Sequence, residues 1–327
     1  MKRILGLTVI GLSATLTACG SSDPDTPEDL QKTLETTRTQ NITQIVSALS
    51  AAQTPASDPA ALTEVTFDGK TTTLKVTLPD RSTVSFGGAP DMSERKQVMY
   101  TPVADPPAFW TGGHSMTSTE VTDTGIRFAS IETSWENDDP ESFLAFGFWE
   151  QYGPEGTDPS FGAFVDGPEI AANNGFAWDS FTARTATYKG VASGFYAYRI
   201  PNVPDSAETG LFQTDLTLNL DLVTRAMSGE TGSDGVTIIS EGEDRTLPIV
   251  VYLESTSLDA DGTFTSNDFE IQSSLVTEAR GSWSGQLSNK AMDGQPRLAA
   301  GTLGGSWTDV RSGKGALTGA WIAGGEE

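Results

Sequence analysis

Apolar residues at three- and four-residue spacings predict one helix near the N-terminus, over residues 28–53. A polar stretch over residues 20–27 precedes it, and Thr26 and Pro27 supply an N-cap and a first helical turn. The apolar face consists of Leu30, Leu34, Ile42, Ile45, Val46 and Leu49. Such a face packs either on the body of the same protein or on a partner, and we expect packing on the body.

Beyond residue 60 the pattern changes to short strands. Residues 65–70, followed by residues 73–78, predict a β-hairpin that turns about Asp68-Gly69. Further strands are expected at 126–135 and 143–152, on either side of an acidic loop at 136–141.

The strand at 143–152 carries aromatic side chains that form either an exposed binding patch or a core. They are Phe143, Phe146, Phe148, Trp149 and Tyr152. Phe146 and Phe148 are separated by one glycine, so this pair shares one face of the sheet. We favour core packing against the C-terminal domain over the exposed patch.

From residue 186 onward, strands and turns recur regularly. Residues 216–222 alternate between leucine and a polar side chain, as in a sheet with one apolar face. Glycine recurs inside the strand candidates, where it allows a sheet to bend or to pack closely, as at the corners of a small barrel. The candidates are 186–199, 210–222, 225–230, 235–240, 247–256, 262–273, 280–288, 297–307 and 314–323.

Two of the short candidates are expected to be halves of one interrupted hairpin, which leaves eight strands. The fold prediction is therefore a mainly β protein. An eight-stranded antiparallel up-and-down β-barrel occupies 186–327, a strand-rich domain occupies 61–185, and one helix lies within 19–60. Membrane barrels alternate in the same way, but the short, glycine-interrupted strands favour a barrel in water.

Residues 1–18 resemble a bacterial lipoprotein signal peptide. Lys2 and Arg3 precede an apolar run at 4–16, which is too short for a membrane-spanning helix of about 20 residues. The run ends in Leu-Thr-Ala-Cys, so Cys19 is the expected site of lipid attachment, palmitate included; an ordinary signal peptide with a chance cysteine is the alternative. Gly20, rather than aspartate, follows Cys19, which is the usual sorting pattern for the outer membrane. We expect a lipid-anchored protein of the outer membrane of a Gram-negative bacterium, with its body exposed at the surface.

Charge and the rarest residues exclude several functions. The 327 residues include 44 Asp and Glu against 20 Lys and Arg, for a net charge of −24, which argues against nucleic acid as a partner. Loss of residues 1–18 removes two positive charges and gives −26, so a cation or a basic partner is easier to accommodate than an anionic one. One Cys excludes an internal disulfide, and one His excludes zinc sites with paired histidines.

Segments within residues 140–327 resemble the transferrin-binding protein B-like lipoproteins. The segments are TATYKGVASGFY (185–196), MSG (227–229), GSWSGQL (281–287) and ALTGAW (316–321), with SFLAFGFW (142–149) and FGAF (161–164) upstream. The shorter relatives are called transferrin-binding protein-like solute-binding proteins. The resemblance implies an eight-stranded barrel beside a strand-rich handle domain, displayed on the outer membrane.

The same resemblance implies a function. Members of this family capture host iron-carrier proteins for a TonB-dependent receptor, and related barrels bind haem-protein complexes or complement regulators. This chain has one handle-barrel lobe, and no residue in it matches the contacts that the family makes to the iron carrier.

Candidate sites for chemistry are few. His114 lies in a glycine-rich stretch, and no Gly-x-Ser-x-Gly accompanies it, so a surface loop residue is favoured over a catalytic base or a haem ligand. Calcium ligands are expected, if anywhere, at Asp259, Asp261, Thr263, Asn267 and Glu270, which follow the spacing of an EF-hand loop. The glycine of that stretch is Gly262, two positions early, which favours a solvated hairpin turn.

A third candidate is an acidic cluster beside Trp135 and Trp149. It comprises Glu132, Glu136, Asp138, Asp139 and Glu141. Paired carboxylates of this kind hydrolyse glycosidic bonds when they lie about 5–10 Å apart, but a solvated acidic loop is favoured.

The favoured function is therefore a non-enzymatic outer-membrane lipoprotein that binds a protein or a metal-bearing ligand, in iron, haem or other solute acquisition. No cofactor and no catalytic residue are expected. A structural or assembly lipoprotein of the envelope is the alternative, and a carbohydrate-active enzyme is third.

Overall fold

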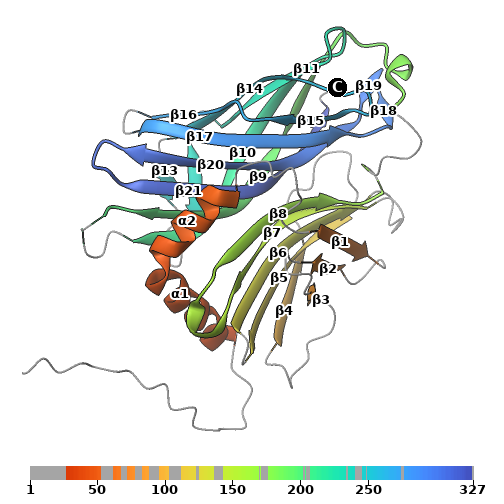
Figure 1. Ribbon diagram of the computed structural model, residues 1–327. Helices are drawn as coiled ribbons and strands as arrows, with labels where there is room; N and C mark the ends of the chain where they lie inside the picture. Colours follow the sequence, from red (N-terminus) through yellow and green to blue (C-terminus); the bar gives the residue numbers. More distant parts are fainter. Residues whose placement is uncertain are drawn as a thin grey trace, which may run out of the picture.

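The computed structural model describes residues 27–52, 62–67, 72–77, 83–87, 96–102, 112–122, 125–135, 143–168, 170, 176–201, 203, 207–232, 235–239, 245–247, 249–273 and 276–325. The protein is mainly β, as predicted, with a nearly closed antiparallel barrel and smaller sheets. Figure 1 shows the barrel above a curved sheet, with two helices placed where the sheet and the barrel meet.

The N-terminal helix is divided in two, whereas one helix was predicted. Helix α1 spans Pro27–Gln40 and α2 spans Ile42–Ala52. Asn41 separates them: its side-chain amide donates to the Thr37 carbonyl at 2.9 Å, and its own carbonyl accepts from the backbone N–H groups of Gln44 and Ile45. The backbone N–H of Asn41 donates to the same Thr37 carbonyl at 3.1 Å, so side chain and backbone share one acceptor at the point where the helix is divided.

The apolar face of the helices packs on the body, as predicted. All six predicted face residues are buried. Five of them contact aromatic residues of the curved sheet and the outer surface of the barrel, including Phe148, Tyr152 and Phe195. The helices therefore stabilise the junction between the two β domains.

The curved sheet is an antiparallel meander of five strands. These are β4 (Lys96–Pro102), β5 (Gly112–Thr122), β6 (Gly125–Trp135), β7 (Leu144–Tyr152) and β8 (Ser160–Asp166). The expected strands at 126–135 and 143–152 are β6 and β7. A smaller antiparallel sheet contains β1 (Leu62–Phe67), β2 (Thr72–Thr77) and β3 (Thr83–Gly87), and the pairing of Val65 with Leu74 confirms the predicted hairpin.

Strand β7 has apolar neighbours on both faces. Phe146 packs with Leu298 and Ile322 on the outside of the barrel, whereas Trp149 packs with the small sheet. The five aromatic side chains predicted for this segment are all buried, so the prediction of a core is confirmed and that of an exposed patch is wrong. Packing against the barrel, as predicted, holds for Phe146 and Phe148, whereas Phe143 and Trp149 pack with the small sheet.

The barrel begins at residue 185. Its long strands are β9 (Thr185–Arg199), β10 (Glu208–Asp221), β17 (Val276–Leu287), β20 (Leu298–Asp309) and β21 (Lys314–Gly325). Its shorter strands are β11 (Ala226–Thr231), β12 (Val236–Ile239), β13 (Arg245–Leu247), β14 (Val250–Ser257), β15 (Thr263–Ser266) and β16 (Phe269–Gln272).

Eight positions surround the barrel axis. The hydrogen-bonded path runs β15-β17-β20-β21-β9-β10-β11-β14-β16, which is nine strands, but β15 and β16 are successive pieces of one segment and count once. Strand β12 pairs with β10 beyond the end of β11, and β13 pairs with β12 and leads into β14. These two short strands therefore extend the positions of β11 and β14 and do not raise the number of strand positions above eight. A two-stranded ribbon of β18 (Ala291–Met292) and β19 (Gln295–Pro296) precedes β20, and 3₁₀ turns lie at Pro154–Gly156 and Trp178–Ser180.

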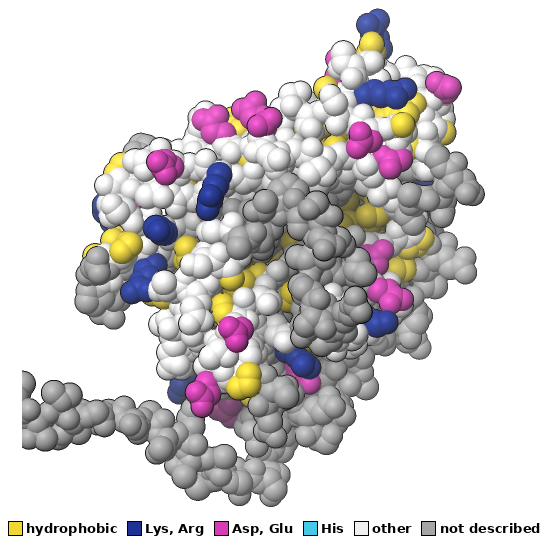
Figure 2. Space-filling view, in the orientation of Figure 1, with side chains coloured by type: hydrophobic (Ala, Val, Ile, Leu, Met, Phe, Trp, Pro, Cys, Tyr) yellow, Lys and Arg dark blue, Asp and Glu magenta, His cyan; other side chains and the backbone are white. Residues whose placement is uncertain are grey.

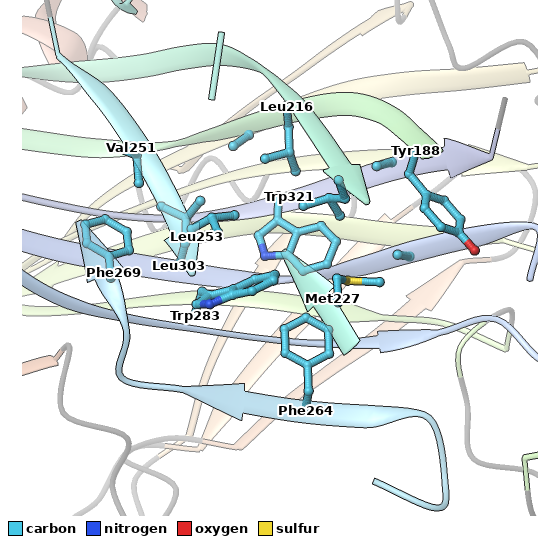
Figure 3. Packing of buried hydrophobic residues seen from close by; sticks show 14 of the residues in the cluster. Tyr188, Leu216, Met227, Val251, Leu253, Phe264, Phe269, Trp283, Leu303 and Trp321 are labelled. Carbon is cyan, nitrogen blue, oxygen red and sulfur yellow. The ribbon is translucent and has the colours of Figure 1, made fainter. Parts of the chain in front are cut away.

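Aromatic and aliphatic side chains fill the barrel interior. In Figure 3, Trp283, Trp321 and Phe264 lie close together with Leu303 and Met227 around them. Trp283 and Trp321 are 1% and 0% exposed. The described side chains inside the barrel thus form a packed core.

Glycine makes room for this core. Gly281 of β17 lies opposite Gly305 of β20, and the ring of Phe269 covers both. A Cβ at Gly305 would come within 2.2 Å of the Phe269 ring. The glycines inside the strands therefore allow close packing of large side chains, one of the two roles that the sequence pattern indicates.

Candidate functional site

An open cleft lies on the outside of the barrel beside helix α2. Its volume is about 1270 Å³. One wall is α2, through Val46, Ser47 and Ser50, and the floor is formed by β17, β20 and the start of β21. We call it the α2 cleft; its remaining lining residues are Asn267, Thr277, Glu278, Ala279, Arg280, Gly281, Ser306, Trp307, Thr308, Lys314 and Gly315.

The alternation of the strands decides which side chains point into the cleft. On β20, Leu298 and Ala300 face outward against the curved sheet, so Ser306 and Thr308 face outward too. On β21, Ala320 and Ile322 face outward, and therefore so does Lys314. On β17, Trp283 faces the barrel core, which places Arg280 on the outer face.

Strand pairing arranges these side chains in two rows. Thr308 is paired with Glu278 on one side and with Lys314 on the other, and Arg280 is paired with Ser306. Directly opposed residues of neighbouring strands have Cβ atoms about 4.5–5.5 Å apart. The cleft floor therefore brings five polar side chains close together on neighbouring strands: the cations Arg280 and Lys314, the carboxylate of Glu278, and the hydroxyl groups of Ser306 and Thr308.

The two cations make no ion pair with any residue of the described segments. Arg280 donates from Nε to Ser306 Oγ at 3.3 Å, and Lys314 is exposed at the start of β21. In Figure 2, dark blue side chains gather at the left end of the barrel, where β17 and β21 begin and β20 ends. This is notable in a chain with 44 acidic residues against 20 basic ones.

The turn between β20 and β21 is held by Asp309. Its carboxylate accepts hydrogen bonds from the backbone N–H groups of Arg311 at 2.8 Å and Gly313 at 2.6 Å, and from the hydroxyl of Tyr198. Burial raises the pKa of Asp309, but these hydrogen bonds outweigh that effect and the pKa lies below its ordinary value. The turn fixes where Thr308 and Lys314 enter the cleft.

Because the folded protein lowers the pKa of Asp309, the stability it contributes is present above about pH 4 and is lost as the pH falls through the folded pKa. We expect Asp309→Asn to lower the melting temperature at pH 7, and the difference from the wild type to shrink below about pH 4. Melting curves recorded between pH 7 and pH 3 check this. A difference that is constant over this range would show that ionisation of Asp309 does not stabilise the turn.

A buried ion pair holds helix α1, and with it α2, against both β domains. Arg38 of α1 and Glu150 of β7 are 5% and 1% exposed, and Arg38 Nε donates to Glu150 Oε1 at 3.1 Å. The guanidinium lies 5.2 Å from the ring of Phe128 on β6 and 5.0 Å from that of Phe195 on β9. One side chain thus contacts the sheet and the barrel.

The surroundings of Arg38 favour its charged form. Burial lowers the pKa of Arg38, but the charge of Glu150 and its hydrogen bonds outweigh burial and leave the pKa raised. Tyr152 donates its hydroxyl to Glu150 Oε2 at 2.7 Å, and burial, followed by the Glu150 charge, raises the pKa of Tyr152 well above 10. Tyr152 therefore remains a neutral donor to the carboxylate.

The calcium candidates are spread along two strands and a turn. Asp259 and Asp261 lie in the turn before β15, where Asp261 Oδ1 accepts the hydroxyl of Thr263 at 2.6 Å. Asn267 follows β15, and Glu270 lies on β16. Within the described segments no three His, Cys, Asp or Glu side chains form a group that could hold a metal ion. The turn is solvated, as favoured from the sequence: Asp259 and Asp261 are both exposed.

His114 lies in strand β5 rather than in a loop. It is paired with Thr133 of β6 on one side and with Pro102 of β4 on the other.

Of the acidic cluster, Glu132 lies on β6, whereas Glu136, Asp138, Asp139 and Glu141 lie outside the described residues. Cys19 also lies outside them, so lipid attachment stays a prediction.

The features of this surface that depend on long-range pairing could not be predicted from the sequence. Arg280, Ser306 and Lys314 come from three strands, and Arg38 and Glu150 are 112 positions apart. One signal was available: Arg280 and Lys314 are basic residues inside strand candidates of a strongly acidic chain.

No described helix of the protein is long and apolar enough to cross a bilayer. Comparison with known proteins assigns no family: no protein-family model matches this chain, and no curated protein matches it.

Proposed function

We propose that the protein is a non-enzymatic binding protein, anchored to the outer membrane by lipid on Cys19, and that it binds a solute in the α2 cleft. The cleft is the observation that supports this most. It is open, it is lined by hydroxyl, amide and charged side chains, and it lies on a rigid barrel surface. The packed barrel interior leaves the outer surface for binding.

The size of the cleft agrees with this role. Ligand sites of proteins usually measure about 300–1,000 Å³, so a cleft of about 1270 Å³ has room for a solute of several rings or for a short chain segment. Within the described residues that line it, the titratable groups are Glu278, Arg280 and Lys314. This set of charged groups suits recognition of a charged ligand through charge-assisted hydrogen bonds.

The position of α2 relates the cleft to the anchor. Helix α1 begins at Pro27, a few residues after the proposed lipid site, and α2 follows it directly. The segment that tethers the body to the membrane therefore also supplies one wall of the cleft. In solute acquisition, such a protein would hold its ligand near the membrane for a transporter, as the resemblance to solute-binding lipoproteins suggests.

Anchoring is tested by replacing Cys19. We expect the wild-type protein to sediment with outer membranes and Cys19→Ala to lose this association. Unchanged membrane association of the variant would contradict the lipoprotein assignment, and Ser21→Ala serves as the matched control next to the site.

Binding is tested with a fluorescent reporter in the cleft. The mature chain with Cys19→Ala has no cysteine, so Ser47→Cys gives a unique thiol on the exposed side of α2 for an environment-sensitive dye. We expect a saturable change in fluorescence with the small-solute fraction of the native growth medium. Lys32→Cys on α1 is the control, because Lys32 is exposed and is not a lining residue. No response at position 47 with any fraction, or equal responses at both positions, would contradict binding in the cleft.

A further inference from the structure

We propose that the α2 cleft recognises an acidic saccharide, a chain of sugar rings that carries carboxylate groups. This inference rests on the proposed function and names the class of its ligand. Three features of the cleft support it: the placement of Arg280, the charge of Lys314, which has no ion-pair partner within the described segments, and the series of hydroxyl groups between and around them.

Arg280 is oriented for recognition of a carboxylate. Its Nε donates to Ser306 Oγ at 3.3 Å, which holds the guanidinium plane, and its two terminal nitrogens donate to no residue of the described segments. A guanidinium presents paired N–H groups that match the two oxygens of a carboxylate. Ser306 is 7% exposed and therefore belongs to the floor of the cleft rather than to its rim.

Lys314 supplies a second positive charge on a neighbouring strand. It is paired with Thr308, which lies beside Ser306 on the same face of β20. Arg199 of β9 is paired with Lys314 on its other side and extends the positive row beyond the cleft. Glu278 is the one carboxylate among the lining residues that the structure describes, so the charged groups of these residues sum to a net positive value.

The hydroxyl groups favour a sugar over a simple anion. Ser47 donates to the Thr43 carbonyl at 3.0 Å, Ser50 to that of Val46 at 2.6 Å, and Thr277 to that of Thr308 at 3.0 Å. Each of these hydroxyl groups donates its proton to a backbone carbonyl, so its oxygen can still accept a hydrogen bond from a hydroxyl group of a ligand. Hydrogen-bond acceptors on α2 and on β17, together with a positively charged floor, suit a ligand that has many hydroxyl groups and carries negative charge.

The local charge of the cleft differs from that of the whole chain. The net charge of −24 repels anions at long range, but charges more than about 10 Å apart are largely screened at physiological ionic strength. Contacts within the cleft are much shorter, so Arg280 and Lys314 dominate there. The long-range field instead lowers the rate at which an anion arrives, and this rate should rise with added salt.

The test measures binding of trigalacturonate, an oligomer of an acidic sugar, to the mature Cys19→Ala chain by calorimetry. Maltotriose is the neutral saccharide of the same ring number, and triglutamate and inorganic phosphate are anions without sugar rings. We expect trigalacturonate to bind at least about tenfold more tightly than any of the other three. Equal binding of maltotriose would overturn the role of charge, and equal binding of triglutamate or phosphate would overturn the role of the sugar.

Two charge-matched variants locate the site. Arg280→Gln with Lys314→Gln should weaken trigalacturonate binding by at least about tenfold, because charge-assisted hydrogen bonds are lost. Arg184→Gln with Lys32→Gln removes the same charge at exposed residues that do not line the cleft, and should leave binding within about twofold. Equal weakening in both double variants would overturn the assignment.

The two proposals fail in different ways. If the dye at position 47 responds to solutes but trigalacturonate does not bind, the ligand class is wrong and the binding function stands. If the dye responds to no solute, the binding function itself fails.

Discussion

Replacing Glu150 with leucine is expected to lower the free energy of unfolding by about 3–5 kcal/mol. The substitution leaves the charge of Arg38 buried between the rings of Phe128 and Phe195 without its carboxylate, and it leaves the hydroxyl of Tyr152 without its acceptor. A buried charge that loses its partner retains the whole cost of its desolvation. Urea unfolding followed by circular dichroism measures the loss.

A double-mutant cycle separates the charge from the packing. Arg38→Met alone should also destabilise strongly, whereas Arg38→Met with Glu150→Leu should recover a large part of the loss, because no unpaired charge remains. The matched control is the exposed pair Glu64 and Lys75, which lies at 3.4 Å with side chains 64% and 51% exposed. Glu64→Leu should change stability by no more than about 1 kcal/mol. Additive losses in the buried cycle would show that Arg38 and Glu150 do not act as a pair.

Replacing Trp321 with alanine is expected to lower the free energy of unfolding by about 3–5 kcal/mol. The indole is fully buried, lies 6.3 Å from the ring of Trp283 and 6.2 Å from that of Phe264, and donates from Nε1 to the Thr302 carbonyl at 3.3 Å. It also covers Gly285 and Gly301, which have no side chain to fill the space that it would leave. The cavity would therefore collapse only in part.

The control for this substitution is Trp178→Ala. Trp178 is partly buried at the edge of the same core, where it contacts Phe176 and Arg225. We expect a smaller loss for Trp178, because its neighbours and solvent can close over the gap. Equal losses for the two tryptophans in urea unfolding would contradict a tightly packed barrel centre.

The elements of the fold were predictable where one local pattern dominates. The spacing of Leu30, Leu34 and Ile45 identifies the buried helical face, and the alternation at 216–222 identifies a barrel strand with one buried face. The glycine pattern indicates close packing, which Gly281 and Gly305 provide beneath Phe269. Each of these patterns involves residues that are close together in the sequence, so a single sequence is enough to recognise it.

Other features depend on contacts that no local pattern contains. The break at Asn41, where the side-chain amide donates to the Thr37 carbonyl, is not revealed by a continuous apolar period. The interruption of the segment that forms β15 and β16 depends on two different partner strands, β17 and β14. The α2 cleft could not be predicted either, because strand register alone brings Arg280 to Ser306 and Thr308 to Lys314.

The central claim is that a solute binds between α2 and the barrel, and amide hydrogen exchange of the mature chain tests it most directly. Exchange is compared with and without a solute fraction that saturates the reporter at position 47. Slower exchange is expected in residues 42–52, 276–281 and 306–315, with no change in the small sheet at 62–87. Protection confined to the sheets at 62–166, or no protection at saturation, would contradict a binding site in the α2 cleft.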